Sequence, residues 1–148
     1  MKKNNDILWM NYAIFLSKIS QNIGEVPVGA VLVYKKKIVV GVGWNQSICM
    51  HDPTAHAEII ALRNGGKYLK NYRLLNTELY VTLEPCNMCL NAILISRVKK
   101  IIFGAKNTSI KNNLKILKNN KKIQIKKNIL KKKCKYILKD FFIKKRNI

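Results

Sequence analysis

The sequence contains few acidic residues. Seven Asp and Glu stand against 29 Lys and Arg, which gives a formal net charge of +22 at pH 7. An imbalance of this size favours a polyanionic partner, with nucleic acid ahead of an anionic membrane surface. Only four of the basic residues are arginine, and lysine, asparagine and isoleucine are all abundant, as expected under a mutational bias towards A/T-rich codons. The charge therefore leaves nucleic-acid binding and compositional drift equally open.

The sequence also lacks the long apolar runs that membrane proteins need. No run approaches the roughly 20 apolar residues that cross a bilayer. The first six residues lead into an amphipathic pattern, which argues against a secretory signal. We therefore expect a cytoplasmic protein without a membrane partner. Hydrophobic residues nevertheless make up 48% of the chain, which excludes a disordered protein.

Linker sequences are missing as well. The chain has three prolines and seven glycines, and no Pro/Gly/Ser-rich stretch divides its 148 residues. This length suits one domain with a core of its own. We predict a single domain over residues 1–148 with a lysine-rich C-terminal third, since residues 99–148 carry 18 of the 29 basic groups.

Apolar periodicity predicts helices that alternate with strands. Helices are expected from about His56 to a stop at Gly65-Gly66, over Asn87–Ser96 and over Ile110–Leu117. A first helix is expected after an Asp6 N-cap, with an apolar face that includes Met10 and Leu16, and a last helix with an apolar face that includes Leu130 and Phe141. The strands are expected at Val28–Tyr34, Ile38–Trp44, Leu79–Leu83, Val98–Phe103 and Ile123–Ile125. This order predicts an α/β fold in three α/β/α layers, with a central mixed sheet of about five strands.

The cysteines are too few and too unevenly spaced for a disulfide framework, since they stand at positions 49, 86, 89 and 134. In an intracellular chain, the Cys86-x-x-Cys89 pair indicates metal or redox chemistry. Both this pair and His56-Ala57-Glu58 fall at the predicted start of a helix, where free N–H groups and the helix dipole favour a thiolate. One imidazole and two thiolates together make three ligands for a tetrahedral zinc ion.

Three protein ligands indicate a catalytic zinc site, because structural sites have four. Cys49 or His51 could supply a fourth ligand, so a structural zinc site stays open. A redox role would leave His56 and Glu58 unexplained. Glu58 lies two residues from His56 and need not bind the metal, so it could act as a general base. Zinc-dependent hydrolysis is therefore the favoured chemistry.

The combination of His56-Ala57-Glu58 with Pro85-Cys86-x-x-Cys89 resembles the signature of the zinc-dependent cytidine and adenosine deaminases. Within this cytidine/deoxycytidylate deaminase superfamily, the chain is most similar to the bacterial tRNA-specific adenosine deaminases. The similarity runs through Glu25–Val33, Gly43–Asn45, His51–Ile59, Asn71–Leu74, Leu79–Cys86 and Phe103–Ala105, and it returns at Asp140–Phe142.

The resemblance implies a cytidine-deaminase-like fold, a homodimer, and conversion of adenosine to inosine at the wobble position of a tRNA anticodon stem-loop. An arginine tRNA with an ACG anticodon is the substrate that it suggests. It also implies that His56, Cys86 and Cys89 hold one Zn²⁺ per subunit and that Glu58 is the catalytic proton shuttle. Asn45, Val28 and the backbone of Ala57 would bind the substrate base.

Other interpretations remain beside this one. Without the resemblance, Asn45 is typical of a turn and Val28 of a sheet core. A zinc deaminase of a free base or nucleoside, such as guanine or cytosine, shares the same chemistry. An inert, basic RNA-binding protein with structural zinc is a third possibility. The chain also departs from the family pattern after Ala105, where Asn107 replaces a usual acidic residue, and we hypothesise that this weakens discrimination against DNA.

Overall fold

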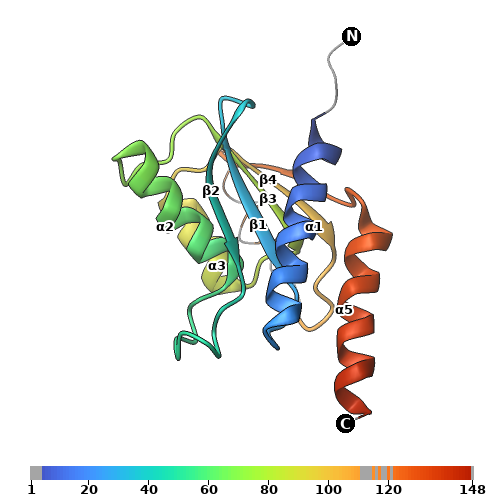
Figure 1. The fold of residues 1–148 in the computed structure, drawn as a ribbon. Coiled ribbons are helices and arrows are strands. Elements are labelled where there is room, and N and C mark those ends of the chain that lie inside the picture. Colours follow the sequence, from blue (N-terminus) through green and yellow to red (C-terminus); the bar gives the residue numbers. More distant parts are fainter. Residues whose placement is uncertain (1–4, 111–114, 116, 118–119, 121, 148) are drawn as a thin grey trace.

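The computed structural model describes residues 5–110, 115, 117, 120 and 122–147, which contain a five-stranded sheet (Figure 1). Its strands are β1 (Gly29–Tyr34), β2 (Ile38–Trp44), β3 (Thr77–Leu83), β4 (Lys100–Ala105) and β5 (Gln124–Lys126). They lie in the order β2-β1-β3-β4-β5, with β1 antiparallel to both of its neighbours and β3, β4 and β5 parallel to one another. The predicted mixed sheet of about five strands is confirmed.

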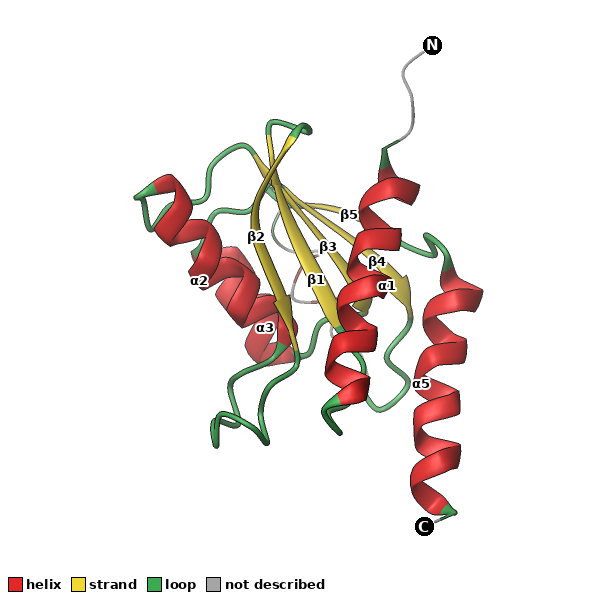
Figure 2. Ribbon diagram, viewed as in Figure 1, coloured by secondary structure: helices red, strands yellow, loops and turns green. Residues whose placement is uncertain are grey.

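Helices cover both faces of this sheet. Figure 2 shows α1 (Asp6–Asn22) and α5 (Lys131–Arg146) on one face, and α2 (Ala57–Leu69) and α3 (Asn87–Ile95) on the other. The predicted α/β/α layering is therefore confirmed. Within the described part of the chain, no helix is both long and apolar enough to cross a membrane.

The sheet is buried on both faces because its strands are apolar at successive positions. In β1, Ala30 and Leu32 join the core beneath α2 and α3. Val31 and Val33 point the other way and join the core beneath α1 and α5. The central strands therefore lie in fixed register between two cores, and the loops at their ends are held at defined positions.

Most predicted boundaries agree with the structure to within two residues, and β2 agrees at both ends. Strand β4 begins two residues later than predicted, because Arg97 takes a left-handed conformation with φ of 66° and Val98 is still leaving that turn. The predicted helix over Ile110–Leu117 lies largely outside the described residues.

The prediction that Gly65-Gly66 ends a helix is wrong. Helix α2 continues through both glycines to Leu69 and ends at Lys70, whose φ is 51°. Gly65 serves close packing: a Cβ atom there would lie 2.4 Å from a methyl carbon of Leu32. The glycine lets α2 approach the sheet, which the local pattern alone could not reveal.

The prediction that Asp6 is an N-cap is also wrong, since Asn5 occupies that position and makes no side-chain capping bond. Asp6 is instead buried, and its Oδ1 accepts a hydrogen bond of 2.8 Å from the Tyr80 hydroxyl. Its Oδ2 accepts a hydrogen bond from Lys126. Asp6 therefore joins α1 to β3 and to β5.

We expect Asp6→Asn to lower the free energy of unfolding by about 1–3 kcal/mol at pH 7, because it replaces a buried, hydrogen-bonded carboxylate. Burial tends to raise the pKa of Asp6, but the bonds from Lys126 and Tyr80 outweigh this and lower it below its usual value. A lowered pKa contributes stability above the unfolded-state pKa of about 4 and loses it as the pH falls through the folded-state pKa. Urea unfolding at pH 7 and pH 3 should therefore show a gap in the free energy of unfolding between wild type and variant, and this gap should be smaller at pH 3. A gap of equal size at both pH values would contradict this.

Candidate functional site

The candidate site lies at the end of the sheet where α2 and α3 both begin. His56 is the N-cap of α2 and Cys86 the N-cap of α3, and neither side chain makes a capping hydrogen bond. Helix α2 packs unusually close to β2 here, because a Cβ atom at Gly43 would lie 2.2 Å from the carbonyl oxygen of Ala57. Both N-cap side chains are thereby free to face each other across one hollow.

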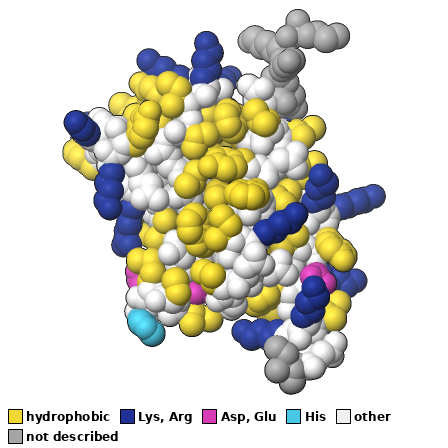
Figure 3. Space-filling model, in the orientation of Figure 1, with side chains coloured by type: hydrophobic (Ala, Val, Ile, Leu, Met, Phe, Trp, Pro, Cys, Tyr) yellow, Lys and Arg dark blue, Asp and Glu magenta, His cyan; other side chains and the backbone are white. Residues whose placement is uncertain are grey.

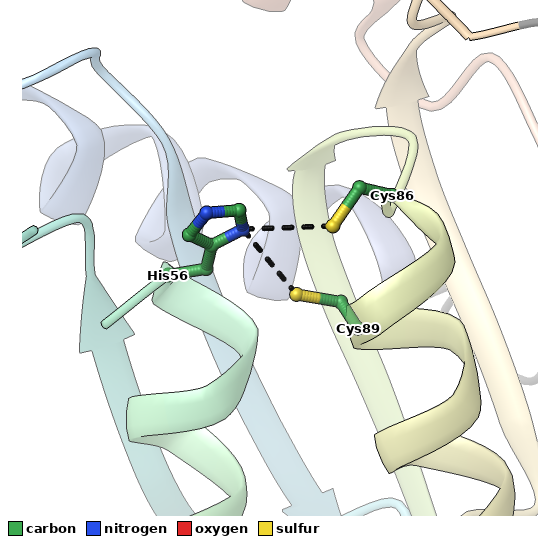
Figure 4. Close-up of side chains that lie close together, drawn as sticks. All are labelled: His56, Cys86 and Cys89. Carbon is green, nitrogen blue, oxygen red and sulfur yellow. Dashed lines mark hydrogen bonds between the residues drawn. The ribbon is translucent and has the colours of Figure 1, made fainter. Parts of the chain in front are cut away.

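Three of the predicted ligands meet in this hollow (Figure 4). His56 Nδ1 lies 3.6 Å from Cys86 Sγ and 3.5 Å from Cys89 Sγ, and all three atoms lie within 4.8 Å of one another. Nitrogen and sulfur atoms bound to one tetrahedral zinc ion, at their usual bond lengths, are about 3.5 Å apart. The three residues therefore fit zinc, with Nδ1 as the ligand atom of His56.

The protonation of these groups also suits a cation. The hydrogen bond from Cys89, together with that from His56, lowers the pKa of the Cys86 thiol to about 4. The hydrogen bond between His56 and Cys86 raises the pKa of His56. The hydrogen bond between Cys89 and Cys86, together with burial, raises the pKa of Cys89. At least one thiolate is thus present at neutral pH, and the thiolate is the form that binds metal.

The cluster has three members among the residues that the structure describes, and neither Cys49 nor His51 belongs to it. Cys49 is exposed, and its thiol lies beside Gln46. Cys134 is buried in the core on the other face of the sheet. The fourth ligand that the sequence left open is therefore not found, and three protein ligands leave one position of a tetrahedral ion free for water or substrate.

A pocket of about 230 Å³ opens beside the three ligands. Glu58, Asn45 and Val28 all line it together with His56 and Cys86, so the structure brings these predicted site residues together. Its other lining residues are Val26, Leu83, Glu84 and Asn107. Val26 and Leu83 are not predicted as pocket residues from the sequence, because their apolar character alone does not distinguish them from core residues.

Ala57 contributes differently from the other predicted substrate contacts. It is fully buried, and its N–H donates a 2.9 Å hydrogen bond to Asn45 Oδ1. Since the amide oxygen of Asn45 is used in this way, its NH₂ group is the part that it can offer to a ligand. Ala57 therefore fixes the orientation of Asn45.

Glu58 is one of the two acidic residues that line the pocket, and it is only 4% exposed. Burial raises its pKa above the usual value for glutamate. A carboxyl group with a raised pKa can both accept and donate a proton near neutral pH, which is what a general acid–base residue requires.

A larger groove of about 600 Å³ adjoins this pocket and shares Val26, Leu83 and Asn107 with it. The groove lies between the residues that follow β4 and helix α5. Its apolar lining includes Leu138 and Phe142, and its basic lining consists of Lys106, Lys131, Lys135 and Lys139. Lys131, Lys135 and Lys139 recur at every fourth position of the helix and so share one of its sides.

On one face of the molecule the basic side chains are spread rather than gathered. Figure 3 shows Lys and Arg on all sides of the face in view, with few acidic side chains between them. The groove is distinct because its lysines stand beside apolar side chains and next to the pocket. Apolar surface for bases and cations for phosphates together suit a single-stranded nucleic acid.

The comparisons with known proteins agree with this arrangement. Residues 3–105 match the model of the "Cytidine and deoxycytidylate deaminase zinc-binding region". The chain is 55% identical to a tRNA-specific adenosine deaminase of Buchnera aphidicola subsp. Baizongia pistaciae, over 98% of this chain and 93% of the relative. It is 49% identical to a tRNA-specific adenosine deaminase of Haemophilus influenzae, over 93% of this chain and 83% of the relative.

Solved structures share the fold. A structure from studies of A-to-I editing by tRNA:A34 deaminases at the wobble position superposes with a TM-score of 0.82 and 29% identity, over 88% of this chain and 99% of that one. A guanine deaminase from Nitrosomonas europaea superposes with a TM-score of 0.83 at 20% identity, over 91% of this chain and 83% of that one. The second likeness shows a common fold only.

Proposed function

The chain belongs to the cytidine and deoxycytidylate deaminase family, and on this basis we propose that it is a zinc-dependent deaminase that converts adenosine to inosine at the wobble position of tRNA. The observation that carries this is the identity of 49–55% to tRNA-specific adenosine deaminases over nearly the whole chain. The pocket beside the His56, Cys86 and Cys89 cluster supplies a place for the reaction. We further propose a single catalytic domain that acts in the cytoplasm as a homodimer with one zinc ion per subunit.

The residues of the pocket divide the chemical work. Zinc held by His56, Cys86 and Cys89 would supply a Lewis acid that makes water acidic near neutral pH. Glu58 accepts the proton that this water loses and passes it to the ring nitrogen beside the reacting carbon of adenine. Hydroxide adds to that carbon and forms the new carbon–oxygen bond. Glu58 then takes the proton of the added hydroxyl group and delivers it to the amino group, so that the carbon–nitrogen bond breaks, ammonia leaves and the oxygen stays as a carbonyl.

Binding of the base would rest on the other side of the pocket. The NH₂ group of Asn45, held by Ala57, can donate a hydrogen bond to the base, and Val28 provides apolar contact. The target base must leave its stack to enter a pocket of this size, which costs least in a single-stranded loop. An anticodon loop is such a substrate, and we propose the ACG loop of an arginine tRNA.

Incubation of the zinc-loaded protein with an ACG anticodon stem-loop tests this function, with mass spectrometry of the nucleoside digest to detect inosine. We expect inosine at the wobble position and not at other adenosines. Deamination of free guanine or cytosine without activity on the stem-loop would favour the alternative small-molecule deaminase. Bound RNA and bound zinc without any product would favour an inert binding protein.

We expect the lysines of the groove to contribute to RNA affinity. Replacing Lys131, Lys135 and Lys139 together with alanine should weaken binding of the stem-loop and should reduce the slope of log affinity against log salt by about two, because each phosphate contact on a single strand contributes about 0.7. Fluorescence anisotropy at several salt concentrations measures both quantities. Alanine at Lys35, Lys36 and Lys37, in the turn between β1 and β2 at the far end of the sheet, removes the same charge and should change the slope less. Equal effects of the two triple variants would indicate that only overall charge matters.

We also expect Asn107→Asp to raise the preference for RNA over DNA. Oδ1 of Asn107 accepts hydrogen bonds from the N–H and the hydroxyl of Ser109, and an aspartate can accept both, so the variant changes charge with little change of local structure. The carboxylate can accept a hydrogen bond from a ribose 2′-OH, which DNA lacks, so we expect the RNA/DNA activity ratio to rise by about fivefold, which is roughly 1 kcal/mol. Matched RNA and DNA hairpins measure the ratio, and an unchanged ratio would refute the hypothesis.

A further inference from the structure

Glu25 is a buried carboxylate that the proposed reaction does not use. It is 2% exposed, and it directly precedes Val26, which lines both the pocket and the groove. Its Oε1 accepts hydrogen bonds from two backbone amides, at 2.8 Å from Ile48 N and 2.9 Å from Cys49 N. Among the described residues it makes no ion pair. Burying a carboxylate without a neighbouring cation costs free energy, and the hydrogen bonds from these two amides offset that cost.

The two amides belong to the loop between β2 and α2, residues 45–56. One end of this loop is Asn45 in the pocket, and the other is His56 in the metal cluster. Both ends are held by the body of the protein, through the bond from Asn45 N to Val28 O and through the start of α2. The loop is seen below the sheet in Figure 1, at the end where α2 begins.

The tip of the loop has few other attachments. Met50, His51 and Asp52 donate their backbone amides to carbonyl groups within the tip itself. An exposed ion pair of 3.9 Å between Asp52 and Arg63 is a weak tie. Ile48 and Met50 are 62% and 47% exposed, so they add little packing. Glu25 is therefore the buried attachment that fixes the tip beside the pocket.

The opposite wall of the pocket is built in the same way. Glu84 is 4% exposed, and its Oε1 accepts a 3.2 Å hydrogen bond from the backbone N–H of Asn107. Asn107 lies in the loop that follows β4 and lines the pocket. Two loops that border the pocket are thus held by buried glutamates through their backbone amides, and these bonds do not depend on the side chains that the loops carry.

We propose that Glu25 is a positioning residue for the substrate pocket: it fixes the tip of the loop of residues 45–56 at the mouth of the pocket, without touching the substrate. This inference rests on the proposed function for its substrate. Removing the acceptor frees the tip and leaves the metal ligands and the two cores in place. We therefore expect removal of the Glu25 acceptor to weaken substrate binding and to leave zinc binding and folding unchanged.

Three variants test this role. Glu25→Leu removes the acceptor at similar volume, Glu25→Asp withdraws it by one methylene, and Glu25→Gln keeps an acceptor oxygen in place. We expect Glu25→Leu and Glu25→Asp to raise the KM for the anticodon stem-loop by about tenfold with a smaller change in kcat, because a loop that must be ordered on binding weakens affinity. Glu25→Gln should restore most of the wild-type KM. Glu78→Gln, a buried glutamate of β3 far from the pocket, should leave KM unchanged.

Amide hydrogen exchange adds a readout that needs no substrate. The amides of Ile48 and Cys49 should exchange at least about tenfold faster in Glu25→Asp and Glu25→Leu, while the amides of α2 keep their protection and the zinc content stays the same. Wild-type KM and unchanged exchange in Glu25→Asp would overturn the proposal. Loss of zinc together with protection across the whole chain in Glu25→Asp would also overturn it, because Glu25 would then support the fold as a whole. Absence of deamination by the wild-type protein would contradict the proposed function and leave the exchange result standing.

Discussion

Replacing Glu58 with glutamine is expected to lower kcat for deamination by about a thousandfold, because general acid–base groups contribute about 10²–10⁴-fold to rate. Glutamine has nearly the same shape and cannot accept a proton from water or pass one to the base. Glu58 lines the pocket and is not one of the three residues of the metal cluster. The zinc content should therefore stay at one ion per chain, and the KM for the stem-loop should change little.

The stability of this variant separates a catalytic role from a structural one. Burial raises the pKa of Glu58, which means that the folded protein disfavours its charged form. A neutral glutamine removes that cost, so the thermal midpoint should not fall. Glu78→Gln, which also changes a buried glutamate, should retain wild-type kcat. Substantial inosine formation by Glu58→Gln would mean that another group moves the proton, and a lower zinc content would mean that Glu58 supports the metal site.

The sequence was sufficient to predict most of the fold because the fold depends on local patterns. The β-branched runs at 28–34 and 38–44 and the short connection between them predicted β1 and β2 closely. The errors arose where a residue's role depends on a distant partner. Asp6 contacts Tyr80 and Lys126, and Gly65 contacts Leu32. Nothing within a few residues of either one indicates these contacts.

The functional site also has parts that local sequence predicts and parts that depend on distant contacts. The metal ligands could be predicted because each lies in a short motif at a helix start, where local geometry determines how it faces. The groove could not be predicted from the sequence, because it forms where α5 lies beside the loop after β4. The bond between Glu25 and the amides of Ile48 and Cys49 likewise joins segments more than twenty residues apart. Motifs thus identify the chemistry, and tertiary contacts determine how the substrate is held.

Loss of zinc is the expected result of replacing Cys89 with alanine. The variant removes one of three ligands, and we expect zinc affinity to fall by more than about a hundredfold, which exceeds the usual effect of mutating a residue that only supports a ligand. Deamination should be lost with the metal. The thermal midpoint should fall too, because a metal bound only by the folded state stabilises that state by mass action.

Cys134→Ala provides the matched control, because Cys134 is also buried but lies in the core beside Gly104 on the other face of the sheet. It should cost about 1 kcal/mol through the space that it leaves and should keep its zinc. Thermal unfolding with and without a chelator distinguishes the two effects. Wild type and Cys134→Ala should both lose stability when the chelator is added, whereas Cys89→Ala should already unfold at the lower temperature and should not respond. A Cys89→Ala protein that retained one zinc ion per chain and responded to the chelator would show that Cys89 is not a ligand; since Cys86 and His56 alone offer too few donors, a different residue would then have to complete the site.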